Sequence, residues 1–329
     1  MLFNLVLDPA GLHADHSSRA ERDVALEIVR NFGVLFISKN DLGVLKECLS
    51  GDELKRWTEA IAGSPYRMAL RNLHEDPTIT VEGLGTEEPG LVILGPESSQ
   101  SWAEQLGVNA ADLVDGLPGS KLHAVTTNVV TQAPPYQERR EWSSSTLIEP
   151  QSGTEVWEQR LRALVAWSTE VKVVDRYGLQ EPQLGQMARN GIPWLLDRIA
   201  SASPSNESPK LTAIVQTPEP PFDDQDGIDQ IADDLWRRAD GALRELELIF
   251  IDDLTARAHQ HDRYLRFSMQ RGRSSRLVTL GNGLDRLSER PIRPPMAFTY
   301  KLQGKDELTA YQANEDRLRK ASILASARP

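Results

Sequence analysis

Short apolar strands alternate with stretches typical of helices along this chain, and this alternation limits the fold more than any other feature. The predicted elements of the first half are strands at 3–7, 33–37 and 91–95 and helices at 18–31, 41–49, 51–62 and 99–106. An element with an apolar face must bury that face against another element, so alternating strands and helices pack as layers. The pattern therefore predicts an α/β fold.

The second half continues the alternation and then ends in a pair of neighbouring strands. Its predicted elements are, in order, a helix at 154–167, a strand at 170–177, a helix at 182–200, a strand at 211–217, a helix at 228–244, a strand at 246–251 and strands at 261–267 and 276–280. This order predicts a mixed sheet that is covered by helices.

The segment between the halves, 131–154, is rich in Pro, Ser, Glu and Gln. This composition is typical of a linker or a long surface excursion. The chain has 329 residues, and domains usually hold about 100–200, so two domains are expected. We place the boundary near 145–155, which gives an α/β domain of unknown role at 1–150 and a second domain at 151–329.

The net charge of −11 argues against a protein coated in basic surface for duplex nucleic acid. A local basic groove is still compatible with that charge, because many arginines lie close together in the second half. They are Arg263, Arg266, Arg271, Arg273, Arg276, Arg286, Arg290 and Arg293. This cluster is either a solvated face or a site for phosphate.

The single cysteine, Cys48, excludes an intramolecular disulfide and a cysteine-based zinc site, and it suits a reducing compartment. The first residues form a predicted strand and lack the basic region that opens a signal peptide. No stretch approaches the roughly 20 apolar residues that span a bilayer. We therefore expect a cytoplasmic protein without a transmembrane segment.

Residues 261–267 carry the side chains most suited to chemistry. Alternate residues of a strand share a face, so His261, Arg263 and Leu265 point to one side. Asp262 points to the other side. A histidine beside a fixed cation can hold a phosphate and attack it. The histidine would act as nucleophile or as acid and base, and the cation would stabilise the phosphoryl oxygens.

Two further segments bring polar residues to strand ends, where ligands of open α/β sheets gather. Asp175 ends a Val-rich strand, and Gly281-Asn282-Gly283 leads to Asp285. The glycines leave backbone amides free to approach an anion. The alternative roles are structural, because Asp175 could start a loop and Asp285 could cap a helix or pair with an arginine.

Two runs of this region, HDRYLRF and RLVTLGNGLDRL, resemble the C-terminal phospholipase D-like domain of microtubule-interacting-and-trafficking (MIT) proteins. Members of that family carry a His-Asp-Arg strand, a short hairpin and a Gly-x-Gly-Leu-Asp turn. They also carry an earlier strand that ends in an aspartate followed by a tyrosine, which VKVVDRY matches. The resemblance covers roughly 157–300. The matched positions are Asp175, His261, Asp262, Arg263, Gly281, Gly283 and Asp285.

The resemblance implies a phospholipase D-like mixed sheet with helices on both faces and one half-site per chain. Two chains would then complete the site, so a homodimer is expected. True phospholipase D enzymes carry His-x-Lys, an aspartate and Gly-Ser-x-Asn. Here Arg263 replaces the lysine, Ser268 stands where the aspartate would be, and Gly281-Asn282 is only loosely similar to the last motif. Arginine is a good bidentate holder of phosphate but does not replace lysine in a tuned catalytic site.

Two functions are expected. The first is a metal-independent phosphodiesterase or nuclease without a cofactor, in anti-phage defence as the resemblance suggests. The second is a non-catalytic module that binds the phosphate of nucleic acid or nucleotide, in preference to a lipid headgroup, and recruits a partner protein. The expected catalytic residues are His261, Arg263, Asp285 and Asp175. The expected phosphate-binding residues are Arg266, Arg276, Gly281, Asn282 and Gly283.

The sequence gives little support for a metal site. His259 could pair with His261, and His13 could pair with His16 and Asp15. Neither group has a further ligand at a recognised spacing, so no metal is expected.

The first domain supports one further hypothesis. Asp8 follows the first strand, and Glu47, Asp112 and Asp115 come later, an arrangement that resembles the strand-end carboxylates of PIN-type nucleases. Many α/β domains place an aspartate after the first strand, so a structural role for Asp8 is preferred. His74 has no partner that the sequence identifies.

Overall fold

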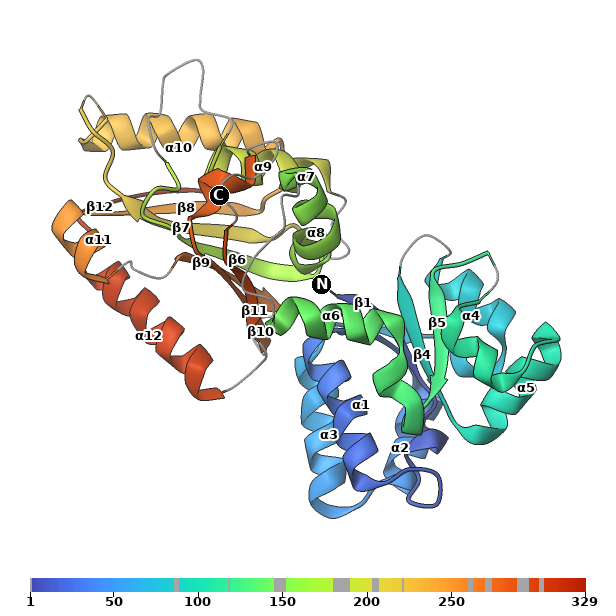
Figure 1. Ribbon diagram of the computed structural model, residues 1–329. Coiled ribbons are helices and arrows are strands. Elements are labelled where there is room, and N and C mark those ends of the chain that lie inside the picture. The colour runs from blue at the N-terminus through green and yellow to red at the C-terminus, as the bar shows by residue number, and fades with distance from the viewer. Residues whose placement is uncertain are drawn as a thin grey trace. The chain divides into compact units, whose positions relative to one another are not determined.

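Figure 1 shows the computed structural model of residues 1–329. The residues that it describes are 2–85, 89–117, 119–144, 152–179, 190–202, 207–220, 222–259, 263–269, 274–288, 296–301 and 305–329. They form helices and two β-sheets, which confirms the predicted α/β class. The chain divides into two compact units, Met1–Glu141 and Trp142–Pro329, which we call the N-terminal unit and the C-terminal unit.

The N-terminal unit contains a parallel sheet of five strands in the order β3-β2-β1-β4-β5. The strands are β1 (Phe3–Leu7), β2 (Gly33–Ser38), β3 (Tyr66–Ala69), β4 (Gly90–Leu94) and β5 (Leu122–Thr126). Every residue of β2 and β4 is buried, as their continuous apolar runs predicted. The order of the strands reverses between β1 and β4. In open α/β sheets, such a reversal opens a crevice at the carboxyl ends of the strands.

Helices join these strands. They are η1 (Pro9–Leu12), α1 (Arg19–Asn31), α2 (Lys39–Cys48), α3 (Gly51–Gly63), η2 (Leu73–Glu75), α4 (Pro77–Leu84), α5 (Pro96–Leu106), η3 (Ala110–Asp115), η4 (Thr127–Gln132) and α6 (Pro134–Ser144). Ser18 and Ser38 begin α1 and α2 with capping boxes, in which Glu21 and Asp41 bind the cap backbone in return. The four helices predicted in the first half correspond to α1, α2, α3 and α5.

The described part of the segment 131–154, whose composition predicted a linker or a long surface excursion, is mostly helical. Helix α6 occupies much of it and begins at a proline, a residue that suits the first turn of a helix. Its aromatic residues Tyr136 and Trp142 are buried. The division between the two compact units falls within α6, after Glu141, and much of the predicted boundary, 145–155, lies outside the described residues.

The C-terminal unit contains the predicted mixed sheet, which has seven strands in the order β11-β10-β9-β6-β7-β8-β12. The strands are β6 (Ser168–Val174), β7 (Lys210–Gln216), β8 (Glu245–Ile251), β9 (Arg263–Met269), β10 (Ser274–Leu280), β11 (Phe298–Lys301) and β12 (Leu324–Arg328). Strands β6, β7 and β8 are parallel, whereas β9 is antiparallel to both β6 and β10. The start of β9 therefore lies at the same edge as the ends of β6 and β10.

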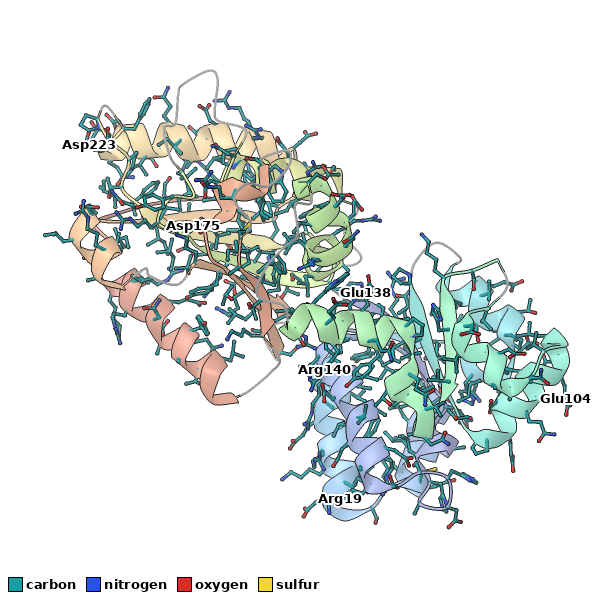
Figure 2. All side chains as sticks on the ribbon, viewed as in Figure 1. Arg19, Glu104, Glu138, Arg140, Asp175 and Asp223 are labelled. Atoms are coloured by element: carbon teal, nitrogen blue, oxygen red, sulfur yellow. The ribbon has the colours of Figure 1, made fainter. Side chains whose placement is uncertain are left out.

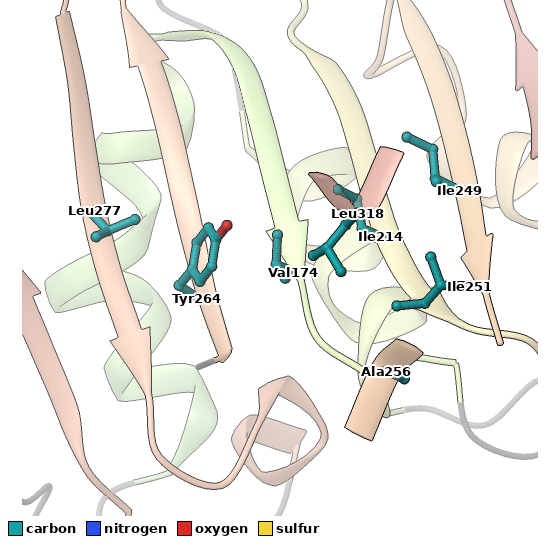
Figure 3. Packing of buried hydrophobic residues seen from close by; sticks show 8 residues of the cluster. All are labelled: Val174, Ile214, Ile249, Ile251, Ala256, Tyr264, Leu277 and Leu318. Carbon is teal, nitrogen blue, oxygen red and sulfur yellow. The ribbon is translucent and has the colours of Figure 1, made fainter. Parts of the chain in front are cut away.

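Helices cover both faces of this sheet, with α9 and α10 on one side and α11 and α12 on the other (Figure 1). The helices are α7 (Gly153–Val156), the π-helical turn η5 (Trp157–Leu161), α8 (Arg162–Ala166), α9 (Ile192–Ser201), α10 (Gln225–Ala239), α11 (Asp253–His259), η7 (Leu284–Ser288) and α12 (Lys305–Lys320). Figure 3 shows Val174 and Tyr264 in one apolar cluster with Ala256 of α11 and Leu318 of α12. Because Tyr264 faces these helices, strand alternation directs Arg263 to the opposite face.

Candidate functional site

Three segments of the C-terminal unit meet at the carboxyl edge of its parallel strands. Asp175 follows β6, Arg263 is the first residue of β9, and Gly283 lies in the turn after β10. The register brings them together, because β9 pairs with β6 on one side and places Arg263 opposite Leu280 of β10 on the other. Ligands of open α/β sheets gather at this kind of edge.

Asp175 lies inside the unit at this edge, with 1% of its surface exposed (Figure 2). Its Oδ1 accepts a hydrogen bond of 3.0 Å from the Tyr177 backbone N–H, and its Oδ2 accepts one of 2.6 Å from the Leu284 backbone N–H. The Nε of Arg263 lies 3.8 Å from Oδ1. Burial raises the pKa of Asp175, while the two hydrogen bonds and Arg263 oppose that rise. The carboxylate thus fastens the turn after β10 to the end of β6.

Two carboxylates pack against Gly283, whose φ is 95°. A Cβ at this position would stand 2.7 Å from Oδ1 of Asp285 and 2.9 Å from Oδ2 of Asp175, so only glycine fits. Oδ1 of Asp285 is buried and has no hydrogen-bond partner among the described residues. Burial raises the pKa of Asp285, and the charges of Arg286 and Arg263 oppose that rise. Among the described residues nothing satisfies this oxygen, so it suits a proton or a ligand.

The guanidinium of Arg263 is a cation of this edge that remains partly accessible to a ligand. It lies over the ring of Tyr177, 4.7 Å from the ring centroid, and 21% of the side chain is exposed. Its contact with Asp175 is too long for a hydrogen bond. No other residue in the described ranges accepts a hydrogen bond from it. Within those ranges, the fork of donors has no acceptor, so it suits bidentate binding of an anion.

Arg176 is a second cation at the same edge, which the sequence prediction did not include. Its guanidinium also lies 4.7 Å from the Tyr177 ring centroid. Its Nε donates to Oε1 of Gln216 at 3.2 Å, and its Nη2 lies 3.3 Å from Oδ1 of Asp253. Arg176 directly follows Asp175, so the strand-end run that identified Asp175 also contained this signal.

Arg266 does not face this edge, which corrects the prediction that it binds phosphate. Strand alternation places it on the opposite face from Arg263, where 5% of it is exposed. Its Nε donates to Oε1 of Glu315 at 2.6 Å, and its Nη1 donates to Oγ of Ser268 at 2.9 Å. This arginine joins α12 to the sheet and has a structural role.

Arg276 is likewise removed from the predicted phosphate site. It lies in the middle of β10 with 1% of its surface exposed, and its side chain hydrogen-bonds Tyr300 of β11. Burial lowers the pKa of this guanidinium, and the contact with Tyr300 opposes the change. A side chain enclosed in this way cannot reach a ligand at the edge of the sheet.

The turn after β10 contains two further residues of the predicted phosphate site, Gly281 and Asn282. The backbone N–H of Gly281 donates to the carbonyl of Ala297 at 2.8 Å, so this amide is not free to bind an anion as predicted. Asn282 is half-buried in the same turn. His261 and Asp262 lie outside the described residues, as does the side chain of His259.

The N-terminal unit has a second polar cluster at the carboxyl edge of its own sheet. Asp8 follows β1, and its Oδ1 accepts a hydrogen bond of 2.9 Å from the Ala10 backbone N–H. Its Oδ2 accepts hydrogen bonds from the Gly95 backbone N–H at 2.9 Å and from Oγ of Ser98 at 2.7 Å. Asp8 therefore joins the ends of β1 and β4, in keeping with the structural role that was preferred for it.

The other carboxylates of the PIN-type arrangement do not join Asp8. Asp112 binds Asn109 at the start of η3, and Asp115 lines a separate surface hollow near the amino end of β5. Glu47 is exposed on α2 and does not line the cavity beside Asp8. The acidic site expected from these residues is therefore not assembled.

His74 lies between Asp8 and Asp41 instead. Its Nε2 is 2.9 Å from Oδ1 of Asp41, and its Nδ1 is 3.7 Å from Oδ1 of Asp8. Burial alone would lower the pKa of His74, but the hydrogen bond to Asp41 and the charge of Asp8 raise it overall. The three residues line a cavity of about 360 Å³, together with Asn40 and Glu97.

Among the residues that the structure describes, no group of three or more His, Cys, Asp and Glu side chains is placed to hold a metal ion. His13 pairs with Asp15 at 3.3 Å, and its ring centroid is 5.9 Å from that of His16. Within all the described ranges, no helix combines the length and the apolar surface needed to cross a membrane.

The chain matches no protein-family model, and none of the curated proteins compared with it is significantly similar to it.

Proposed function

We propose that the C-terminal unit has a phospholipase D-like fold and binds a phosphodiester at the edge formed by Asp175, Arg263 and the turn after β10. The donors of the Arg263 guanidinium, which meet no acceptor among the described residues, carry this proposal, because a partly exposed arginine at a strand-end edge suits an oxyanion better than any neutral ligand. Nucleic acid or nucleotide is the expected source of the phosphodiester. A role in anti-phage defence belongs to the same proposal.

The expected reaction is metal-independent hydrolysis. A ring nitrogen of His261 attacks the phosphorus, a P–N bond forms, and the bond from phosphorus to the leaving oxygen breaks. Asp285 in its protonated form gives its proton to that oxygen, and the raised pKa of Asp285 favours this form. Water then attacks the phosphorus, the P–N bond breaks, and a proton of the water returns to Asp285. Arg263 stabilises the phosphoryl oxygens throughout.

A homodimer follows from the same proposal. Each chain carries one His-Asp-Arg motif and therefore one half-site, so a second copy would supply the other half. The oligomeric state of the purified protein, measured by light scattering, tests this part independently of turnover.

Binding without turnover is the second candidate function. Two observations favour it. Both oxygens of Asp175 are used to hold backbone N–H groups, and Arg263 stands in place of the lysine of phospholipase D enzymes. In this case the same edge would hold the phosphate and the protein would recruit a partner.

The test compares the full chain with three variants on bis(4-nitrophenyl) phosphate and on a labelled single-stranded oligonucleotide, with and without a chelator. We expect His261→Ala and Arg263→Ala to lower turnover by about 100-fold or more. Arg244→Ala is the matched control, because Arg244 precedes β8 at the opposite edge of the sheet and is about half exposed.

Two results would count against these functions. Turnover that is equal in the wild-type and His261→Ala proteins excludes the enzymatic mechanism. Phosphate binding that Arg263→Ala does not weaken excludes the site itself, and with it the binding function.

A further inference from the structure

The ring of Tyr177 supports two guanidinium groups. Arg176 and Arg263 both lie over it, each 4.7 Å from the ring centroid. The two cations are therefore separated by no more than twice that distance. They approach from different elements, since Arg176 follows β6 and Arg263 begins β9. One aromatic ring therefore brings two cations close together at this edge.

Each guanidinium is held in place separately. Gln216 at the end of β7 and Asp253 at the start of α11 hold Arg176. Asp175 faces Arg263 at 3.8 Å. Asp253 also pairs with Arg257 at 2.7 Å, so its charge is shared and does not fully neutralise Arg176. Separate partners therefore fix the position of each of the two cations at this edge.

Both cations remain accessible. The exposed fraction of the side chain is 19% for Arg176 and 21% for Arg263. Partly exposed side chains that are already held in place are suited to electrostatic recognition of phosphate, because little side-chain entropy is lost on binding. The Tyr177 ring is already covered by cations, so its role is to support them.

We propose that this edge contains two phosphate subsites, the first at Arg263 and the second at Arg176. Its ligand is then a molecule with two neighbouring phosphate groups, as in a diphosphate or in successive phosphates of a nucleic-acid strand. This inference rests on the proposed phosphate site at Arg263 and adds to it the class of ligand.

The experiment measures binding of inorganic phosphate, pyrophosphate and a fluorescent oligothymidylate to the full chain at constant ionic strength. We expect wild-type protein to bind pyrophosphate about tenfold or more tightly than phosphate. Arg176→Ala should bring the pyrophosphate affinity down to that of phosphate and leave phosphate binding within about twofold. Arg263→Ala should weaken the binding of all three probes.

The oligonucleotide separates the two sources of paired phosphates. If Arg176→Ala weakens the oligothymidylate more than pyrophosphate, the subsites follow a nucleic-acid backbone, and the opposite order indicates a free diphosphate. Either order supports two subsites. Equal affinity of the wild-type protein for phosphate and pyrophosphate overturns them, and so does an equal loss of both in Arg176→Ala.

A control variant guards against loss of fold. Arg176→Lys keeps the positive charge but not the fork of donors, so it should retain pyrophosphate selectivity in part. If neither variant changes selectivity while phosphate still binds through Arg263, the second subsite is wrong and the proposed function stands. If no form of the protein binds phosphate, the proposed function itself fails.

Discussion

The carboxylate of Asp175 accepts a 2.6 Å hydrogen bond from the backbone N–H of Leu284, a residue 109 positions later in the chain. This bond ties the end of β6 to the turn that follows β10. The same turn sets the positions of Gly283 and Asp285, so the stability of the sheet edge and the geometry of the candidate site depend on one contact. A substitution in this turn should therefore change both the stability of the protein and the geometry of the candidate site.

Gly283→Ala should destabilise the protein more than an ordinary glycine substitution. A positive φ alone costs a non-glycine residue roughly 1–2 kcal/mol. At Gly283 the new Cβ would also stand 2.7 Å from Asp285 and 2.9 Å from Asp175. Gly241→Ala is the control, because Gly241 has φ of 74° and open space around it. Urea unfolding should show a loss for Gly283→Ala at least about 1 kcal/mol beyond that of the control. Equal losses would mean that the two carboxylates move aside freely.

Asp285→Asn should raise the free energy of unfolding at neutral pH. The folded-state pKa of Asp285 is raised above its ordinary value of 3.8, so ionisation opposes folding once the pH exceeds that value. The advantage of the variant should shrink as the pH falls through the raised pKa towards 3.8. Unfolding by urea at a series of pH values measures this. Asp223→Asn, at an exposed position labelled in Figure 2, is the matched control. An advantage for Asp285→Asn that does not change with pH would contradict the assignment.

His74→Gln should destabilise the N-terminal unit most strongly at acidic pH. The folded-state pKa of His74 is raised above its ordinary value of 6.5 by Asp41, Asp8 and Glu75, so the charged ring stabilises the folded state. That contribution is complete below 6.5 and is lost as the pH rises through the folded pKa. The difference between wild type and variant should therefore narrow as the pH rises. His13→Gln, at a largely exposed ring, serves as the comparison, and a difference that widens at alkaline pH would refute the prediction.

Arg266→Ala should cost about 1.5–3 kcal/mol of stability, because the buried Glu315 carboxylate loses its hydrogen bonds to Arg266 but keeps Lys172, whose Nζ lies 3.2 Å from Oε2. Replacing both residues together, as Arg266→Met with Glu315→Leu, should recover much of this loss. Thermal and urea unfolding measure both effects. Phosphate binding in the double variant should match that of the wild type, since Arg266 lies on the opposite face from Arg263. A double variant that folds normally but no longer binds phosphate would return Arg266 to the site.

Local patterns in the sequence predicted much of the fold. The continuous apolar runs of β2 and β4 and the strand-ending Asp175 could be found within short windows, because each reflects burial of neighbouring residues. Helix α6 was missed, since its buried Tyr136 and Trp142 are spaced among polar residues that resemble a linker. The composition of a short segment does not reveal which of its few apolar residues are buried.

Local sequence patterns likewise indicated one part of the candidate site, and distant contacts determine the rest. Strand alternation places Arg263 and Arg266 on opposite faces of the sheet. The same rule therefore already argues against Arg266 at the phosphate site. The sequence does not identify Glu315 as the partner of Arg266, because a partner 49 residues away leaves no local signal. His74 was unassigned for the same reason, since Asp41 and Asp8 are brought to it only by the sheet.

Every neighbouring pair of strands in the N-terminal sheet is parallel, so each must be joined by a crossover, and β1 pairs with residues as distant as Gly90. Such separations make the search for native contacts slow, because loop closure must precede any gain from pairing. In the C-terminal unit, the antiparallel strands β9 and β10 are close together in the chain. Their contact can therefore form early. The same unit also contains distant pairings, since β6 pairs with β9 over a separation as long as that from Ser168 to Met269. We therefore expect the pair of β9 and β10 to form before the other strand pairs of either unit.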